Sequence, residues 1–310
     1  MKESEDDKVI LALIEEAKRL GNGEPLAALQ RLAEAARLAQ ARDDLTKERA
    51  IALREQATLL TRLGKTQEAM TAAQEALERF QSLGDDVNAA KTLNAIGNIH
   101  FIRSELSDAL RRYQESLALW QKLNDKLWIA GALHNIGIVY DALADYAKAL
   151  DYHQQGLRIL QEVGDKRAVA LSLNNIGLVY FSLADYASAL EHHRQSLRLY
   201  QETKDERGIA VSMMNIANAL LVLGDCAKAQ RHFQESYEIS KKLHDKRNVA
   251  QALLGLGKAY SGLNQAAEAM RCFEEGLAIA IEINAKLTEA EFHLQLGKHC
   301  ARRQAKRSSD

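Results

Sequence analysis

The chain has 310 residues with 41 basic and 42 acidic side chains, and aromatic residues make up only 5%. This balance argues against a nucleic-acid-binding protein, which usually carries a basic excess, and no apolar run approaches the roughly 20 residues of a membrane span. The polar start of the chain, MKESEDDK, does not resemble a secretory signal. Three scattered cysteines, Cys226, Cys272 and Cys300, argue against disulfides and favour a cytoplasmic location.

An irregular first repeat is expected over residues 7–43. A helix is predicted from about residue 7 to Leu20, and the run from Gly21 to Gly23 ends it. Pro25 then starts the next helix, where its missing N–H does no harm. This repeat matches the next one only at an offset of 41 or 42 residues. Terminal repeats of an array commonly deviate in this way, because they cover the end of the core.

Six regular repeats of 40 residues are predicted over residues 44–285. Alanine recurs at this step without interruption, and small residues recur in three other columns. A fixed period of this size is typical of a solenoid, in which each repeat contacts its neighbours. The alanine column consists of Ala50, Ala90, Ala130, Ala170, Ala210, Ala250 and Ala290.

Each repeat is predicted to be two amphipathic helices joined by a short turn. In one repeat Leu173, Ile176, Gly177 and Tyr180 follow the i, i+3, i+4, i+7 spacing of an apolar stripe. The second helix carries a complementary stripe that includes His193. Neither helix buries its stripe alone, so stacked copies share a continuous core. Glycine within the first helix allows a neighbouring helix to approach closely.

The helix ends also follow the period. Aspartate opens each new repeat, where its side chain can cap the first free N–H groups of a helix, at Asp85, Asp125, Asp165, Asp205 and Asp245. The residue before it, such as Gly84 or Asn124, suits a left-handed helix end. A closing helix is expected over 286–303, followed by a disordered tail over 304–310. The prediction is therefore seven helix pairs and one closing helix.

The columns resemble the tetratricopeptide repeat family, whose pattern reads here as Leu133, Ile136, Gly137, Tyr140 and Ala149, with His153 at an aromatic position. The usual repeat has about 34 residues, whereas this one has 40. The longer form resembles kinesin light chain, the spindle-orientation adaptors that bind GoLoco proteins, and bacterial signalling arrays. The resemblance implies an all-α, right-handed α-solenoid (superhelix) that spans 1–310 as a single array, and it implies protein binding.

In this family the first helices line a concave surface. The resemblance therefore implies a peptide-binding groove beside the apolar stripes, lined by Asn94, Asn98, His134, Asn135, Asn174, Asn175, Asn215, Asn218 and Lys258. An asparagine amide donates and accepts at once, so it can pair with a peptide backbone of any sequence. The alternative interpretation is that these amides bond to neighbouring helices and stiffen the array.

No catalytic, cofactor or metal site is predicted. The histidines His153 and His193 stand where the repeat places an aromatic ring, and His100 stands at the packing position of Tyr140 and Tyr180. The segment GLGK at 255–258 lacks the first glycine and the final serine or threonine of a phosphate loop. The residues therefore favour a protein without enzymatic activity.

The functional prediction is a protein-interaction scaffold whose partner is a protein or peptide, and neither nucleic acid nor a membrane. The alternative is a regulatory or sensory module of a larger, bacterial-type signalling protein such as a cyclase or kinase, in which the array transmits binding or self-associates. The last helix starts like another first helix and has no second helix to pair with. This pattern suggests that the chain is part of a longer protein.

Overall fold

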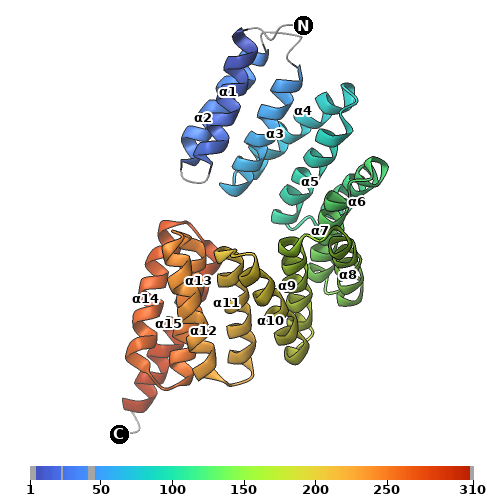
Figure 1. The fold of residues 1–310 in the computed structure, drawn as a ribbon. Helices are drawn as coiled ribbons and strands as arrows, with labels where there is room; N and C mark the ends of the chain where they lie inside the picture. The colour runs from blue at the N-terminus through green and yellow to red at the C-terminus, as the bar shows by residue number, and fades with distance from the viewer. Residues whose placement is uncertain (1–4, 22–23, 41–45, 308–310) are drawn as a thin grey trace. The chain divides into compact units, whose positions relative to one another are not determined.

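A computed structural model describes residues 5–21, 24–40 and 46–307. These residues form fifteen α-helices and no β-strand (Figure 1). The chain divides into two compact units, residues 1–159 and 160–310. None of the helices in the described segments is both long enough and apolar enough to cross a membrane.

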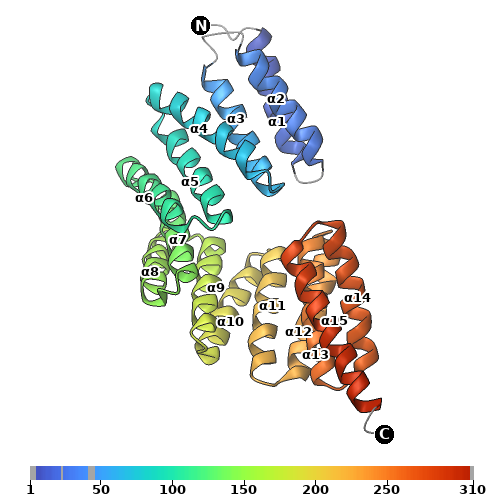
Figure 2. The same cartoon turned by 180° about the vertical axis from the view of Figure 1, so that it is seen from behind.

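The first unit stacks four helix pairs, and the boundary between the units falls within the last helix. Consecutive helices from α1 to α7 pack against one another (Figure 2). The helices are α1 (Glu5–Leu20), α2 (Pro25–Gln40), α3 (Thr46–Arg62), α4 (Thr66–Ser82), α5 (Asp86–Ile102), α6 (Leu106–Leu123), α7 (Lys126–Ala142) and α8 (Tyr146–Val163).

The second unit stacks three helix pairs and a closing helix. Each helix from α9 to α15 packs against the next one in the chain, and alternate helices also touch, as α11 does with α13. The helices are α9 (Lys166–Ser182), α10 (Tyr186–Glu202), α11 (Glu206–Val222), α12 (Cys226–Lys242), α13 (Lys246–Gly262), α14 (Ala266–Glu282) and α15 (Lys286–Arg307). The all-α solenoid fold is thereby confirmed in both units.

The turns recur every 20 residues, and each contains one residue in the left-handed region. These residues are Gly64, Gly84, Ser104, Asn124, Ala144, Gly164, Ala184, Lys204, Gly224, His244, Asn264 and Asn284. A left-handed residue satisfies the last carbonyl groups of the helix that it ends. Glycine and asparagine adopt this conformation easily, and their predicted role as helix ends is confirmed.

The predicted aspartate caps are confirmed. In α5, α7, α9, α11 and α13 the aspartate before the helix accepts a hydrogen bond from the backbone N–H three residues later, at 3.0–3.2 Å. This bond satisfies one of the free donors at the start of a helix. Each aspartate therefore fixes the residue at which a new repeat begins.

The small-residue columns lie where two helices of one repeat approach closely. The alanines from Ala50 to Ala250 in the predicted column are at most 1% exposed. In the same contact the buried hydroxyl of Ser116 donates to the carbonyl of Ala90 at 2.9 Å. The last alanine, Ala290, is exposed, because no further repeat follows α15 within the described residues.

The glycine column faces rings of the second helix. A Cβ atom at Gly137 would lie 2.6 Å from the His153 ring, and one at Gly177 would lie 2.6 Å from the His193 ring. His153 and His193 are 2% and 0% exposed, so they fill aromatic core positions as predicted. The glycine is needed because the ring occupies the space of a side chain.

The chain ends differ from the prediction. Helix α15 continues to Arg307, so residues 304–307 are helical and the expectation of disorder there is wrong. Gly21 ends α1 with a φ of +43°, and α2 begins at Pro25 as expected. The predicted break at Asn22 and Gly23, and the tail at 308–310, lie outside the described residues. A single array over 1–310 stays a prediction.

Candidate functional site

In the first unit, two of the predicted groove residues join neighbouring first helices. Asn135 of α7 donates from Nδ2 to Oδ1 of Asn94 of α5 at 2.6 Å, and both side chains are half-buried. The bond spans 41 residues of sequence, so it connects one repeat to the next. In this unit the amides therefore bond to a neighbouring helix, as the alternative interpretation expects.

The second unit contains the same bond and extends it into the core. Asn215 of α11 donates to Oδ1 of Asn174 of α9 at 3.0 Å, again over 41 residues. The Nδ1 atom of His193 lies 2.8 Å from the same oxygen. Asn174 is 4% exposed and His193 is fully buried, so a core ring holds the amide of Asn174. We call the pairs Asn94–Asn135 and Asn174–Asn215 the asparagine ladder.

Asn98, Asn175 and Asn218 complete the predicted amides on first helices. Asn98 is exposed, and its Oδ1 accepts from the hydroxyl of Tyr113 at 2.7 Å. Asn175 and Asn218 are half-buried on α9 and α11. The fold thus covers these amides only in part, and each keeps some solvent-exposed surface on its first helix.

Lys258 differs from the other predicted groove residues because it already has a partner of opposite charge. Its Nζ lies 2.9 Å from a carboxylate oxygen of Glu291 on α15. The hydrogen bond from Lys258 is the largest cause that lowers the pKa of Glu291. This ion pair joins α13 to the closing helix, so Lys258 is not set apart for an external carboxylate.

His134 lies beside a core ring of its own repeat. Its ring centroid is 4.9 Å from that of His153. Burial lowers the pKa of His134 to about 4 and that of His153 to about 3. Both rings are therefore neutral near pH 7, and they pack as small aromatic groups rather than as cations.

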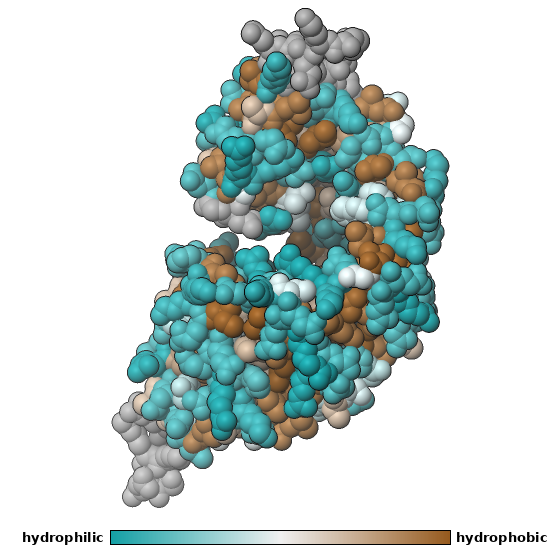
Figure 3. Space-filling model, viewed as in Figure 1, coloured by the Kyte–Doolittle hydropathy of each residue, from teal (hydrophilic) through white to brown (hydrophobic). Residues whose placement is uncertain are grey.

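Exposed apolar side chains accompany the amides, and they are not among the predicted groove residues. On α9, Leu171 is 48% exposed and Leu178 is 39% exposed. With Asn175 between them they follow the i, i+4, i+7 spacing of one helix face. Figure 3 shows hydrophobic residues scattered among hydrophilic ones on the surface that it displays. The sequence signal for these residues is their position, because Leu171 and Leu178 lie outside the predicted apolar stripe of α9. A leucine on a solvent-exposed helix face does not contribute to core packing.

The family model named tetratricopeptide repeat matches residues 88–162, 128–202 and 208–282. No curated protein matches the chain significantly. Among solved structures, BtubC (BKLC) from P. vanneervenii has a TM-score of 0.61 and 20% identity, over 71% of this chain and 92% of that one.

Two further solved structures are similar to the chain. A Rap protein complexed with Competence and Sporulation Factor has a TM-score of 0.67 and 16% identity, over 92% of this chain and 80% of its own. A signal transduction ATPase with numerous domains and a tetratricopeptide repeat sensor, from Pyrococcus horikoshii, has a TM-score of 0.62 and 15% identity, over 97% of this chain and 53% of its own. At these identities the likeness shows the fold alone. Because the family model matches more than half of the sequence, the chain belongs to the tetratricopeptide repeat family.

Proposed function

We propose that the protein is a non-enzymatic scaffold that binds an extended segment of another protein on its first helices. In the first unit the face belongs to α5 and α7, and in the second to α9 and α11. The observation that carries this proposal is the asparagine ladder together with the exposed Leu171 and Leu178 beside it. Family membership supports protein binding in general, and the residues on this face supply the finer assignment.

The ladder is compatible with stiffening and with binding at once. An asparagine side chain offers two N–H donors and one carbonyl acceptor. Asn135 and Asn215 each use one N–H in the ladder. These bonds leave the second N–H and the carbonyl oxygen of Asn135 and of Asn215 for a ligand. A peptide backbone offers the same donor and acceptor groups at every residue, so the amides recognise the backbone and the leucines recognise apolar side chains.

A second candidate function is a sensor module within a larger signalling protein. It is favoured by the likeness to the signal transduction ATPase with a tetratricopeptide repeat sensor, and this chain covers 53% of that protein. In that case the output domain, such as a cyclase or kinase, lies outside the 310 residues. Both candidates use the same binding face, and the full-length gene distinguishes between them.

The test uses a peptide ligand selected from a random library with the wild-type protein. The triple variant Asn135→Ala, Asn175→Ala and Asn215→Ala removes amides from the first helices of both units, and Asn248→Ala removes one from a helix start elsewhere. Each lost hydrogen bond weakens binding by about 0.5–1.5 kcal/mol, so a peptide that contacts Asn175 and Asn215 of the second unit should bind the triple variant at least about fivefold more weakly. Circular dichroism checks that helicity is unchanged.

Equal affinity of the triple variant and the wild type would refute the proposal. A loss of helicity in the triple variant would instead support the purely structural role of the amides. The Asn248→Ala variant should bind like the wild type, and a matching loss there would show that the effect is not specific to the face.

A further inference from the structure

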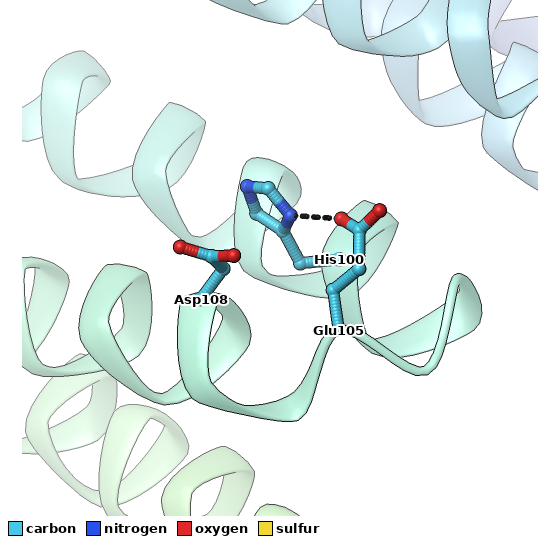
Figure 4. A group of neighbouring side chains, drawn as sticks. All are labelled: His100, Glu105 and Asp108. Atoms are coloured by element: carbon cyan, nitrogen blue, oxygen red, sulfur yellow. Dashed lines mark hydrogen bonds and ion pairs between the residues drawn. The ribbon is translucent and has the colours of Figure 1, made fainter.

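The turn between α5 and α6 brings together three side chains of the kinds that bind metal ions. His100 stands in the last turn of α5, Glu105 precedes α6, and Asp108 lies in the first turn of α6. One potential ligand atom from each lies within 4.8 Å of the others, and no other group of this kind occurs among the residues described. Figure 4 shows the imidazole next to both carboxylates.

Equivalent turns in other repeats are built differently. In the α7–α8 turn the corresponding residues are Tyr140, Asp145 and Lys148. There Asp145 accepts the backbone N–H of Lys148 at 3.2 Å, and its other carboxylate oxygen lies 2.8 Å from the Lys148 ammonium. The α11–α12 turn repeats this arrangement with Asp225 and Lys228. A capping aspartate with a neutralising lysine therefore suffices to make the turn.

The α5–α6 turn replaces both parts of that arrangement. Glu105 makes no side-chain cap for α6, and its Oε2 instead lies 2.6 Å from Nδ1 of His100. Asp108 stands where Lys148 stands, so a second carboxylate takes the place of a cation. Since like charges at close range repel, and the fold makes the same turn without them, the three side chains call for a reason outside the packing of the repeat.

The surroundings suit a metal ion that enters from solvent. The His100 side chain is 15% exposed, whereas Glu105 is 42% and Asp108 is 49% exposed. The ring is thus held by the fold and the carboxylates are accessible. Oδ1 of Asp108 accepts from Nη2 of Arg111 at 2.9 Å. A hydrogen bond to one oxygen of a ligating carboxylate fixes its orientation and leaves the other oxygen for the ion.

We propose that His100, Glu105 and Asp108 bind one divalent transition-metal ion of the Zn²⁺ class. One imidazole nitrogen and two carboxylate oxygens are ligands that zinc accepts, with water in a fourth position. Magnesium and calcium prefer oxygen ligands alone, so the histidine selects against them. Zinc bonds of about 2.0–2.2 Å require the carboxylates to turn inward. The ion would link the end of α5 to the start of α6.

The test is a calorimetric titration of the metal-free, untagged full chain with ZnCl₂. His100→Tyr installs the residue found at the equivalent position in other repeats, and Asp108→Lys does the same for the carboxylate. The control is His293→Ala, which removes an exposed histidine outside the cluster. We expect one site in the wild type and in the control, and at least tenfold weaker binding in the other two variants. Co²⁺ should give a visible absorption band with the wild type and with His293→Ala, but not with His100→Tyr or Asp108→Lys.

Three results would overturn the proposal: no binding of Zn²⁺ at millimolar concentration, undiminished binding in both cluster variants, or loss of the site in His293→Ala. Circular dichroism monitors the fold of each variant. If His100→Tyr loses helicity, Asp108→Lys decides, because its exposed side chain does not contribute to the core.

Discussion

The contact between Gly177 and His193 gives a sharp prediction about stability. In a Gly177→Ala variant the new Cβ atom would lie 2.6 Å, 2.8 Å and 3.0 Å from three atoms of the His193 ring. The ring is fully buried and its Nδ1 is bonded to Asn174, so it has no free direction in which to retreat. The substitution therefore forces the ring and its hydrogen bond to shift together.

Three contributions decide the magnitude. Overpacking a core costs about 1–3 kcal/mol, and loss of the hydrogen bond costs about 0.5–1.5 kcal/mol more. Alanine gains about 1 kcal/mol over glycine inside a helix. We expect Gly177→Ala to lower the free energy of unfolding by about 0.5–3.5 kcal/mol. Urea unfolding followed by circular dichroism measures this change.

Gly131 supplies the matched control. It lies inside α7 and is exposed, and a Cβ atom there would meet nothing within 4 Å. Gly131→Ala should therefore stabilise the protein by about 1 kcal/mol, the opposite sign from Gly177→Ala. A Gly177→Ala variant as stable as the wild type, or more stable, would refute the reasoning that the glycine column exists to seat the rings.

The remaining predictions concern pH, caps and the Lys258 pair. Burial lowers the pKa of His193 to about 4, against about 6.5 in an unfolded chain. Because the unfolded chain binds the extra proton, the free energy of unfolding should fall as pH drops from about 6.5 toward 4. His193→Phe should weaken that dependence, as urea unfolding at several pH values will test. Asp245→Ala removes a cap bond and should destabilise by about 0.5–2 kcal/mol. Gln265→Ala, at a helix start without a side-chain cap, should change little in the same unfolding assay. Lys258→Met should raise the pKa of Glu291 toward its ordinary value, because the Lys258 hydrogen bond is the main cause of its lowering. An NMR titration in which that pKa stays low would contradict the assignment.

The helices were predictable because packing and capping restrict which residue types can occupy each repeated position. Ala90 and Gly177 recur at one step since each must fit against a neighbouring helix, and Asp165 recurs since every repeat needs a cap. The left-handed turns at Lys204 and His244 were weaker signals. There the helix end is imposed by the stacked repeat rather than by the residue's own preference.

The candidate site was less predictable, because its bonds depend on the angle between neighbouring helices. Sequence position placed Asn135 and Asn215 on first helices. It did not show that each would bond to the asparagine 41 residues earlier. The pairing of Lys258 with Glu291 was missed for the same reason, since it joins two helices whose register is set only by packing.

Hydroxyl-radical footprinting of the protein with a library-selected peptide bound tests most directly whether the first helices bind the peptide. We expect the exposed Leu171 and Leu178 of α9 to lose reactivity when the peptide is bound. Leu183 and Leu223, which are 44% and 55% exposed in turns of the same unit, should keep theirs. Protection of Leu183 and Leu223 with Leu171 and Leu178 left reactive would contradict the assignment of binding to the first-helix face.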